Sequence, residues 1–241
     1  MIESGQIGVK MRYLDMDKVN MFLGTGENNS DGQNLKDFLE SYDPNRYQHP
    51  SNTVDTLVFT YIEEKGIKKI NKLLLIKRGN HPGIGWWALP GGFVDFMENL
   101  DDAAKRELQE ETGVENIEIE QLGSYGDYDR DPRTRIITTA YVALVKDGSV
   151  SAQAGDDAKD AGWFNIEEKL LFCGEDKEIY CLKMEDTDND VLLQAKVEVT
   201  LNPNAILKNK KYTVVERDLL CADHGAIILE GYHYIKKLLE Q

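Results

Sequence analysis

Three glutamates, Glu107, Glu110 and Glu111, lie within one short stretch of the chain that has the features of a helix. At about 100° per residue, their side chains fall on one face of that helix. Three like charges on one face repel each other, so helix stability gives no reason to gather them. A hard divalent cation supplies a reason, because Mg²⁺ and Mn²⁺ prefer oxygen ligands such as carboxylates. A solvated acidic face is the alternative, and the three glutamates alone do not exclude it.

The helix that must position these glutamates has recognisable ends. Asn99 is suited to the N-cap, and acidic residues follow it in the first turn, where they favour the positive end of the helix dipole. Gly113 is placed to end the helix in a left-handed cap. Arg106 precedes Glu110 by four residues and can hold that carboxylate in position. Leu108 points away from the acids, so we expect it to face a core.

The spacing of the whole stretch 92–114 is more specific than its glutamates. Its fixed positions are Gly92, Glu98, Arg106, Glu107, Leu108, Glu110, Glu111, Gly113 and Val114. This pattern resembles, position for position, the signature of the Nudix hydrolases. The resemblance implies hydrolysis of a diphosphate that is linked to another group. In this chemistry Mg²⁺ or Mn²⁺ neutralises phosphate oxygens while water attacks phosphorus.

The resemblance also implies a role for each residue of the pattern. Glu110 and Glu111 are the main metal ligands, and the others assist them or complete the metal shell through water. Arg106 orients the carboxylates. The implied metal ligands are Gly91 through its carbonyl, Glu98, Glu107, Glu110 and Glu111, and the implied catalytic residues are Arg106, Glu107, Glu110 and Glu111.

The general base is not fixed by the pattern, because Nudix families take it either from the helix or from a distant loop. Glu107 is the candidate on the helix. Asp157 and Glu167 are the candidates in the later segment. Carboxylates that titrate close together near a metal can exchange roles, so spacing alone does not decide among the three.

Three arginines, Arg78, Arg133 and Arg135, are predicted to bind the phosphates of the substrate. The planar guanidinium group matches the geometry of phosphate oxygens. Arg133 and Arg135 alternate at the start of a predicted strand, so we expect them to point to the same side. For each arginine, an ion pair with one of the many acidic residues is the alternative.

Charge and composition exclude several kinds of protein. A net charge of −15 disfavours binding to nucleic acid, which requires a basic surface for the phosphates. No apolar run approaches the ~18 residues needed to cross a bilayer, and the first residues lack the apolar centre of a signal peptide. Three scattered cysteines argue against a disulfide framework. We therefore expect a cytoplasmic protein that binds neither nucleic acid nor membrane.

The elements around the glutamate helix follow an alternating pattern of strands and helices. Strands are predicted at 53–62, 72–78, 117–126, 135–145 and 161–165, and a β-hairpin at 178–201. This order indicates an α/β (α+β) fold, and the resemblance implies the Nudix α/β/α sandwich with a mixed sheet. We expect an N-terminal extension (1–50) containing a short helix at 35–42, followed by a Nudix domain (51–241) that has a β-hairpin insertion (166–216) and a terminal helix (223–240).

Segments outside the glutamate helix resemble one bacterial group of Nudix proteins. The segments 128–145 and 155–164 and the sequence DHGAII look like the ADP-ribose pyrophosphatase-like group, which includes Nudix-related transcriptional regulators of NAD metabolism. The resemblance implies hydrolysis of ADP-ribose to AMP and ribose 5-phosphate. Other ADP-sugars, dinucleotides such as NADH, and alkyl nucleotides stay open as substrates.

The same resemblance leaves a second class of function open. The regulators carry a winged-helix domain after the late helix, whereas this chain ends at Gln241, so we expect no such domain. The intact glutamates favour an enzyme. The alternative is a non-catalytic regulator that senses ADP-ribose or another nucleotide through the Nudix fold. Family resemblance and the unexplained first 50 residues also lead us to expect a homodimer.

Overall fold

The chain divides into two compact units in the computed structural model, Met1–His49 and Pro50–Gln241. The residues that the structure describes are 16–155, 158–206 and 209–240. The described part of the first unit contains three short helical elements: α1 (Met16–Asn20), α2 (Leu35–Ser41) and the 3-10 turn η1 (Pro44–Arg46). Helix α2 occupies the predicted position, and it begins after Asn34, whose side chain accepts the backbone N–H of Asp37.

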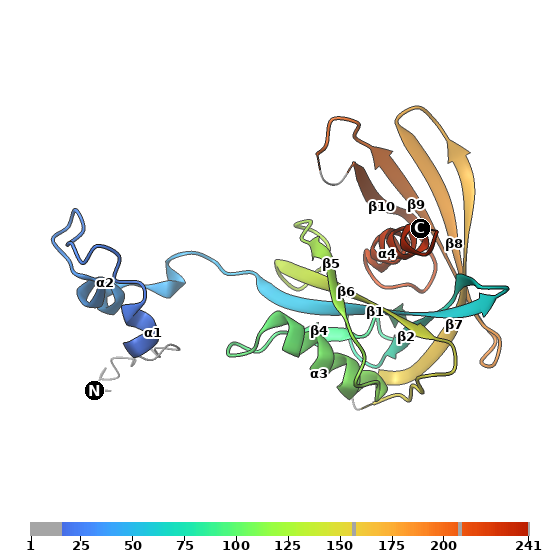
Figure 1. Ribbon diagram of the computed structural model, residues 1–241, viewed down its shortest axis with the longest axis horizontal. Coiled ribbons are helices and arrows are strands. Elements are labelled where there is room, and N and C mark those ends of the chain that lie inside the picture. The colour runs from blue at the N-terminus through green and yellow to red at the C-terminus, as the bar shows by residue number, and fades with distance from the viewer. Residues whose placement is uncertain (1–15, 156–157, 207–208, 241) are drawn as a thin grey trace, which may run out of the picture. The chain divides into compact units, whose positions relative to one another are not determined.

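The second unit is built on one mixed sheet of ten strands (Figure 1). The strands are β1 (Ser51–Glu64), β2 (Ile67–Arg78), β3 (Trp87–Ala88), β4 (Gly91–Phe93), β5 (Glu120–Tyr125), β6 (Ile136–Lys146), β7 (Ala158–Cys173), β8 (Lys177–Asp186), β9 (Val191–Leu201) and β10 (Lys210–Arg217). Their order is β10-β9-β8-β7-β2-β1-β6-β5, with β3 beside β2 and β4 beside β1. Strands β1 and β6 are parallel, and the other pairs of named strands are antiparallel.

Two helices cover opposite faces of the central strands. Alternate residues of a strand point to opposite faces, and β1 shows the consequence. Its Leu57 packs with α4 (His224–Leu239), while its Val58 packs with Leu108 of α3 (Leu100–Thr112). The predicted α/β/α sandwich with a mixed sheet is confirmed.

Helix α3 has the ends that the sequence predicts, but one cap works differently. Gly113 is left-handed, with φ 69°, and its N–H donates to the carbonyl of Gln109. Asn99 holds the N-cap position without a capping hydrogen bond from its side chain. Its amide donates instead to the carboxylate of Asp102, at 3.1 Å. The N-terminal end of α3 therefore uses a side-chain pair rather than the predicted cap.

The sheet continues well beyond the minimal pattern of strands. The strand predicted at 161–165 belongs to β7, which continues to Cys173. Residue 166, the predicted start of the hairpin insertion, therefore lies inside this strand. Strands β8 and β9 form the predicted hairpin, and β10 was not predicted. Figure 1 shows these added strands curving beside α4, and both β9 and β10 pack against that helix. Strand β10 carries charged residues at both ends around the strand formers Tyr212 to Val215, and it pairs with β9.

Candidate active site

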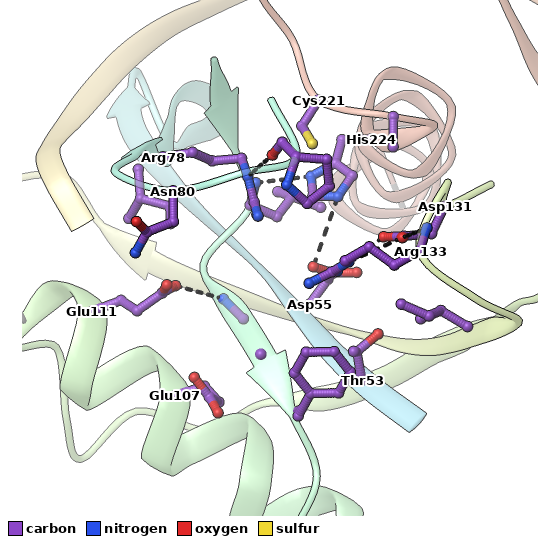
Figure 2. Close-up of a pocket in the computed structure, with 18 of the residues that line it drawn as sticks. Thr53, Asp55, Arg78, Asn80, Glu107, Glu111, Asp131, Arg133, Cys221 and His224 are labelled. Carbon is purple, nitrogen blue, oxygen red and sulfur yellow. Dashed lines mark hydrogen bonds and ion pairs between the residues drawn. The ribbon is translucent and has the colours of Figure 1, made fainter. Parts of the chain in front are cut away.

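A cavity of about 410 Å³ lies between α3, the turn that joins β3 to β4, and the start of α4 (Figure 2). Figure 2 shows Glu107 and Glu111 on the α3 side, with Asp131, Arg133 and His224 opposite them. The residues that line the cavity include Thr53, Asp55, Arg78, Asn80, Gly91, Gly92, Arg106, Glu107, Glu111, Arg130, Asp131, Arg133, Cys221 and His224. Both acidic and cationic side chains therefore reach one concave site.

The guanidinium group of Arg106, which lines the cavity, gathers three carboxylates, of which Glu107 also lines it and Glu98 and Glu110 do not. It donates to Glu98 from Nε and Nη2, both at 2.8 Å, and from Nη1 to Glu107 at 2.7 Å and Glu110 at 3.0 Å. These hydrogen bonds raise the pKa of Arg106 and hold the pKa of Glu98 below its usual range. The i, i+4 spacing anticipated the contact with Glu110, whereas the contact with Glu98 depends on the loop before α3.

Two glycines allow the turn after β3 to approach the glutamates. The N–H of Gly91 donates to Glu111 at 2.8 Å, and burial raises the pKa of that carboxyl to about 8. A Cβ at Gly91 would lie 2.0 Å from the carbonyl oxygen of Val54, so only glycine allows β4 to pair this closely with β1. Burial also raises the pKa of Glu107. The site thus places two desolvated carboxylates beside the backbone of this turn.

The structure separates the three arginines that were predicted to bind phosphate. Arg78 lines the cavity, donates to the carbonyl of Pro82 at 2.8 Å, and forms no ion pair with any described residue. Arg133 also lines the cavity but is paired with Asp131 at 2.9 Å. Arg135 does not line it, and its backbone carbonyl accepts the N–H of Ser51 at the start of the β1–β6 pairing.

A buried arginine that the sequence reading missed ties a loop to the start of α4. Arg130 donates two hydrogen bonds to Asp223, from Nε at 2.9 Å and from Nη2 at 2.8 Å. Its Nη2 also lies 3.9 Å from the carboxylate of Asp55. Burial opposes the charge of Arg130, but these acids outweigh it and raise the arginine pKa. Asp223 occupies the N-cap position of α4, yet its carboxylate serves Arg130 instead of capping the helix.

His224 is the second residue whose place the sequence did not reveal. The structure buries its side chain at the cavity wall. Its Nδ1 accepts the backbone N–H of Leu89 at 3.0 Å, and its Nε2 lies 3.8 Å from Asp55. Asp55 in turn accepts the hydroxyl of Thr138 at 2.6 Å. Burial lowers the pKa of His224, which favours the neutral ring with its proton on Nε2. The Asp-His pair at a helix start was the available signal.

Comparison with known proteins identifies the family. Residues 38–183 match the NUDIX domain, which is more than half of the chain. The chain belongs to the Nudix family. The family that the glutamate pattern predicted is therefore confirmed, together with the class of enzyme, a Nudix pyrophosphohydrolase.

This Nudix chain is similar to several known proteins. It is 42% identical over 128 residues to an ADP-ribose pyrophosphatase of Methanocaldococcus jannaschii, covering 52% of this chain and 69% of that protein. It is 37% identical over 135 residues to the ADPR responsive transcriptional repressor NtrR of Acinetobacter baylyi, covering 55% and 52%. A MutT/nudix family protein from Enterococcus faecalis has a TM-score of 0.62 at 30% identity, covering 94% of this chain and 76% of the other.

The donor set of the Nudix motif suits a hard divalent cation. It consists of carboxylate oxygens and the backbone carbonyl of Gly91. Two of the carboxylates, Glu107 and Glu111, are desolvated by burial. Glycine at position 92 leaves space that the Glu107 carboxylate fills. Among the described residues, no three acidic, histidine or cysteine side chains stand close enough together to hold a metal ion, and Arg106 pairs with three of the acids.

The candidates for the general base are not equally placed. Glu107 lines the cavity, and Glu167 is exposed on β7 and does not line it. Asp157 lies outside the described residues.

In the described part of the chain, no helix is long and apolar enough to cross a membrane.

Proposed function

We propose that this Nudix protein hydrolyses ADP-ribose to AMP and ribose 5-phosphate with Mg²⁺ or Mn²⁺. The observation that carries the proposal is that Glu107 and Glu111 of the Nudix motif line a cavity that also holds Arg78 and Arg133. Glu98 and Glu110 do not line this cavity, but Arg106 joins both of them to Glu107. The choice of ADP-ribose draws support from the relative named ADP-ribose pyrophosphatase. Other ADP-sugars and dinucleotides are the competing substrates.

The proposed metal ligands are the carboxylates of the motif and one carbonyl. When bound, the metal neutralises phosphate oxygens and favours attack by water on phosphorus. Arg106 keeps the acids gathered before the ion arrives, because it pairs with Glu98, Glu107 and Glu110. The proposed ligands are the Gly91 carbonyl, Glu98, Glu107, Glu110 and Glu111, of which Glu107 is the candidate base that lines the cavity.

Arg78 is the strongest candidate for holding the diphosphate. It reaches the cavity from the end of β2, and its charge is not neutralised by any described carboxylate in an ion pair. Arg133 is the second candidate, although it must share its charge with Asp131. A guanidinium group without an ion pair contributes most to the binding free energy of a phosphate, because its new charged hydrogen bonds replace only hydrogen bonds to water.

A nucleotide sensor is the second candidate function. The observation in its favour is the similarity to a repressor described as ADPR responsive, at 37% identity. A sensor would bind ADP-ribose with little turnover. An enzyme needs the metal carboxylates for each cycle and should lose its turnover when one of them becomes an amide.

A hydrolysis screen tests both functions. The protein is incubated with Mg²⁺ or Mn²⁺ and with ADP-ribose, NADH, sugar nucleotides or nucleoside triphosphates, beside the Glu110→Gln variant. Formation of AMP and ribose 5-phosphate from ADP-ribose, lost in the variant, supports the proposed enzyme. Turnover of another substrate overturns the choice of ADP-ribose. Tight binding of ADP-ribose without turnover of any substrate supports the sensor.

We further propose the remaining features of the protein on the same family basis. The Nudix domain comprises 51–241 and the extension 1–50. The protein acts as a cytoplasmic homodimer that binds neither nucleic acid nor membrane, consistent with a net charge of −15. Light scattering tests the dimer, and a monomeric mass at working concentrations would rule it out.

A further inference from the structure

The first residues of α4 contact both walls of the cavity at once. Asp223 bonds to Arg130, which lies in the loop 127–135 on one side. His224, the next residue, bonds to Leu89 at the turn on the other side. Helix α4 itself is anchored in the core through Ile227 and neighbouring residues, so its start is a fixed point for both contacts.

The contact through His224 connects to the turn Leu89–Gly91, which carries two relevant hydrogen bonds. The N–H of Leu89 donates to His224 Nδ1 at 3.0 Å. Two residues later, the N–H of Gly91 donates to Glu111 at 2.8 Å. Pro90 between them leaves little freedom, because its ring fixes its own φ angle. Strand β1 also holds this peptide, because the N–H of Thr56 donates to the carbonyl of Pro90 at 2.8 Å. His224 therefore fixes one end of the turn and β1 the other, and together they orient the Gly91 N–H toward Glu111.

The contact through Asp223 leads to the opposite wall. The side chain of Arg130 is buried, and its two hydrogen bonds to Asp223 fix its orientation. Inside the loop, the N–H of Arg130 donates to the carbonyl of Asp127, and Asp131 accepts both the backbone and the side chain of Arg133. The loop is thus held together internally. The hydrogen bonds from Arg130 to Asp223 connect this loop to the start of α4, and the guanidinium of Arg133 also lies over the ring of Phe93.

We propose that Asp223 and His224 are positioning residues that align the two walls of the active site. His224 positions the turn that carries Gly91, and Asp223 positions the loop that carries Arg133. This inference rests on the proposed function for the roles of those two residues. It assigns distinct kinetic effects to the two neighbouring residues. Because His224 positions the turn of the proposed metal ligand Gly91, its loss should lower kcat. Because Asp223 positions the loop of the proposed substrate ligand Arg133, its loss should raise KM.

The first test of His224 needs no metal or substrate. Amide hydrogen exchange in the metal-free protein should become faster at both Leu89 and Gly91 in His224→Ala than in the wild type, by about ten-fold or more. His224→Asn should restore most of the protection, because its side-chain oxygen can take the place of Nδ1. His224→Leu offers similar bulk without an acceptor and should not restore it. Unchanged exchange at Gly91 in His224→Ala would overturn the proposal that His224 positions Gly91 through Leu89.

Kinetics then separate the two residues. His224→Ala should lower kcat by about 10-fold to 100-fold and weaken Mn²⁺ binding, with KM within about two-fold of the wild type. Asp223→Ala should raise KM by about ten-fold and leave kcat within about two-fold. Asp223→Asn keeps an acceptor for Arg130 and should have a smaller effect on KM. Equal changes of kcat and KM in both alanine variants would show a general loss of structure and contradict the assignment.

Ile235→Ala is the matched control for stability. Ile235 is buried in the same helix, but it does not line the cavity. If it lowers the melting temperature as much as His224→Ala yet keeps the kinetic constants, destabilisation of α4 is not the cause of the kinetic changes. The same kinetic loss in Ile235→Ala would overturn the positioning roles. If the wild type hydrolyses no substrate, the proposed function fails, while exchange at Leu89 and Gly91 and Mn²⁺ binding still decide the role of His224.

Discussion

Gly92 lies against the carboxylate of Glu107. A Cβ at position 92 would be 2.4 Å from Glu107 Oε2 and 2.5 Å from its carboxyl carbon. The glycine of the Nudix motif thus has a direct physical purpose here, because it leaves the space that the first glutamate of the helix occupies. A larger residue would displace a flexible side chain rather than backbone, so function should suffer more than folding.

Gly92→Ala should therefore separate activity from stability. We expect a loss of turnover of roughly 100-fold, because the Glu107 carboxylate must move, and a change in unfolding free energy of less than about 1 kcal/mol. Enzyme assays and urea unfolding measure the two quantities. Gly126→Ala is the matched control, since a Cβ there would meet Ile137 at an ordinary 3.4 Å. Full activity of Gly92→Ala would show that the position of Glu107 does not matter.

The two remaining glutamates of the helix should differ in their effect on stability. Glu110→Gln and Glu111→Gln should each reduce turnover by roughly 100-fold or more, because each removes a charge from the proposed metal site. The Glu110 side chain is 57% exposed, so its amide variant should melt at the wild-type temperature. Metal-free Glu111→Gln should melt at or above that temperature near neutral pH, because the buried Glu111 must take up a proton on folding and glutamine avoids this cost. Retained turnover in both variants would exclude the proposed metal ligands.

Arg78 should matter more for substrate binding than Arg135. Arg78→Ala should raise KM for ADP-ribose by roughly 10-fold to 100-fold, the value of a charged hydrogen bond to phosphate. Arg78→Lys should recover only part of this loss, because an ammonium group cannot form the same paired hydrogen bonds. Arg135 lies outside the cavity lining, so Arg135→Ala should change KM by less than about two-fold. The reverse order would restore the prediction made from strand alternation.

The acid stability of the protein should depend on Glu168, which joins β7 to α4. Burial opposes its ionisation, but His233 and Lys236 outweigh that effect and hold the pKa of Glu168 below its ordinary value of 4.5. A lowered pKa in the folded state stabilises the protein above the unfolded pKa, and this contribution disappears as pH falls through the folded pKa.

Glu168→Gln tests this dependence. At neutral pH it should reduce the unfolding free energy by about 1–3 kcal/mol, and the difference from the wild type should shrink below about pH 4.5. Urea unfolding at several pH values measures both quantities. A difference that stays constant down to about pH 3 would show that the ionisation of Glu168 is not the cause.

The sequence by itself determined the family and the helix that carries the family's motif. The fixed spacing from Gly92 to Val114 identified the family, and helical periodicity placed Leu108 in the core opposite the acids. Gly113 ended the helix as predicted. The hairpin of β8 and β9 was equally visible, because alternation along each strand is a local signal. Such features depend on neighbours in the chain, so the residue order is sufficient to reveal them.

The tertiary structure alone decided how the cavity is completed. His224 and Leu89 are 135 residues apart, and Arg130 and Asp223 are 93 apart, so no local pattern links them. The tertiary structure also separated Arg133 from Arg135, since Arg133 lines the cavity beside its partner Asp131 and Arg135 does not line it. An aspartate or histidine at a helix start has many possible partners. Only the return of α4 across the sheet brings these two against the walls of the site.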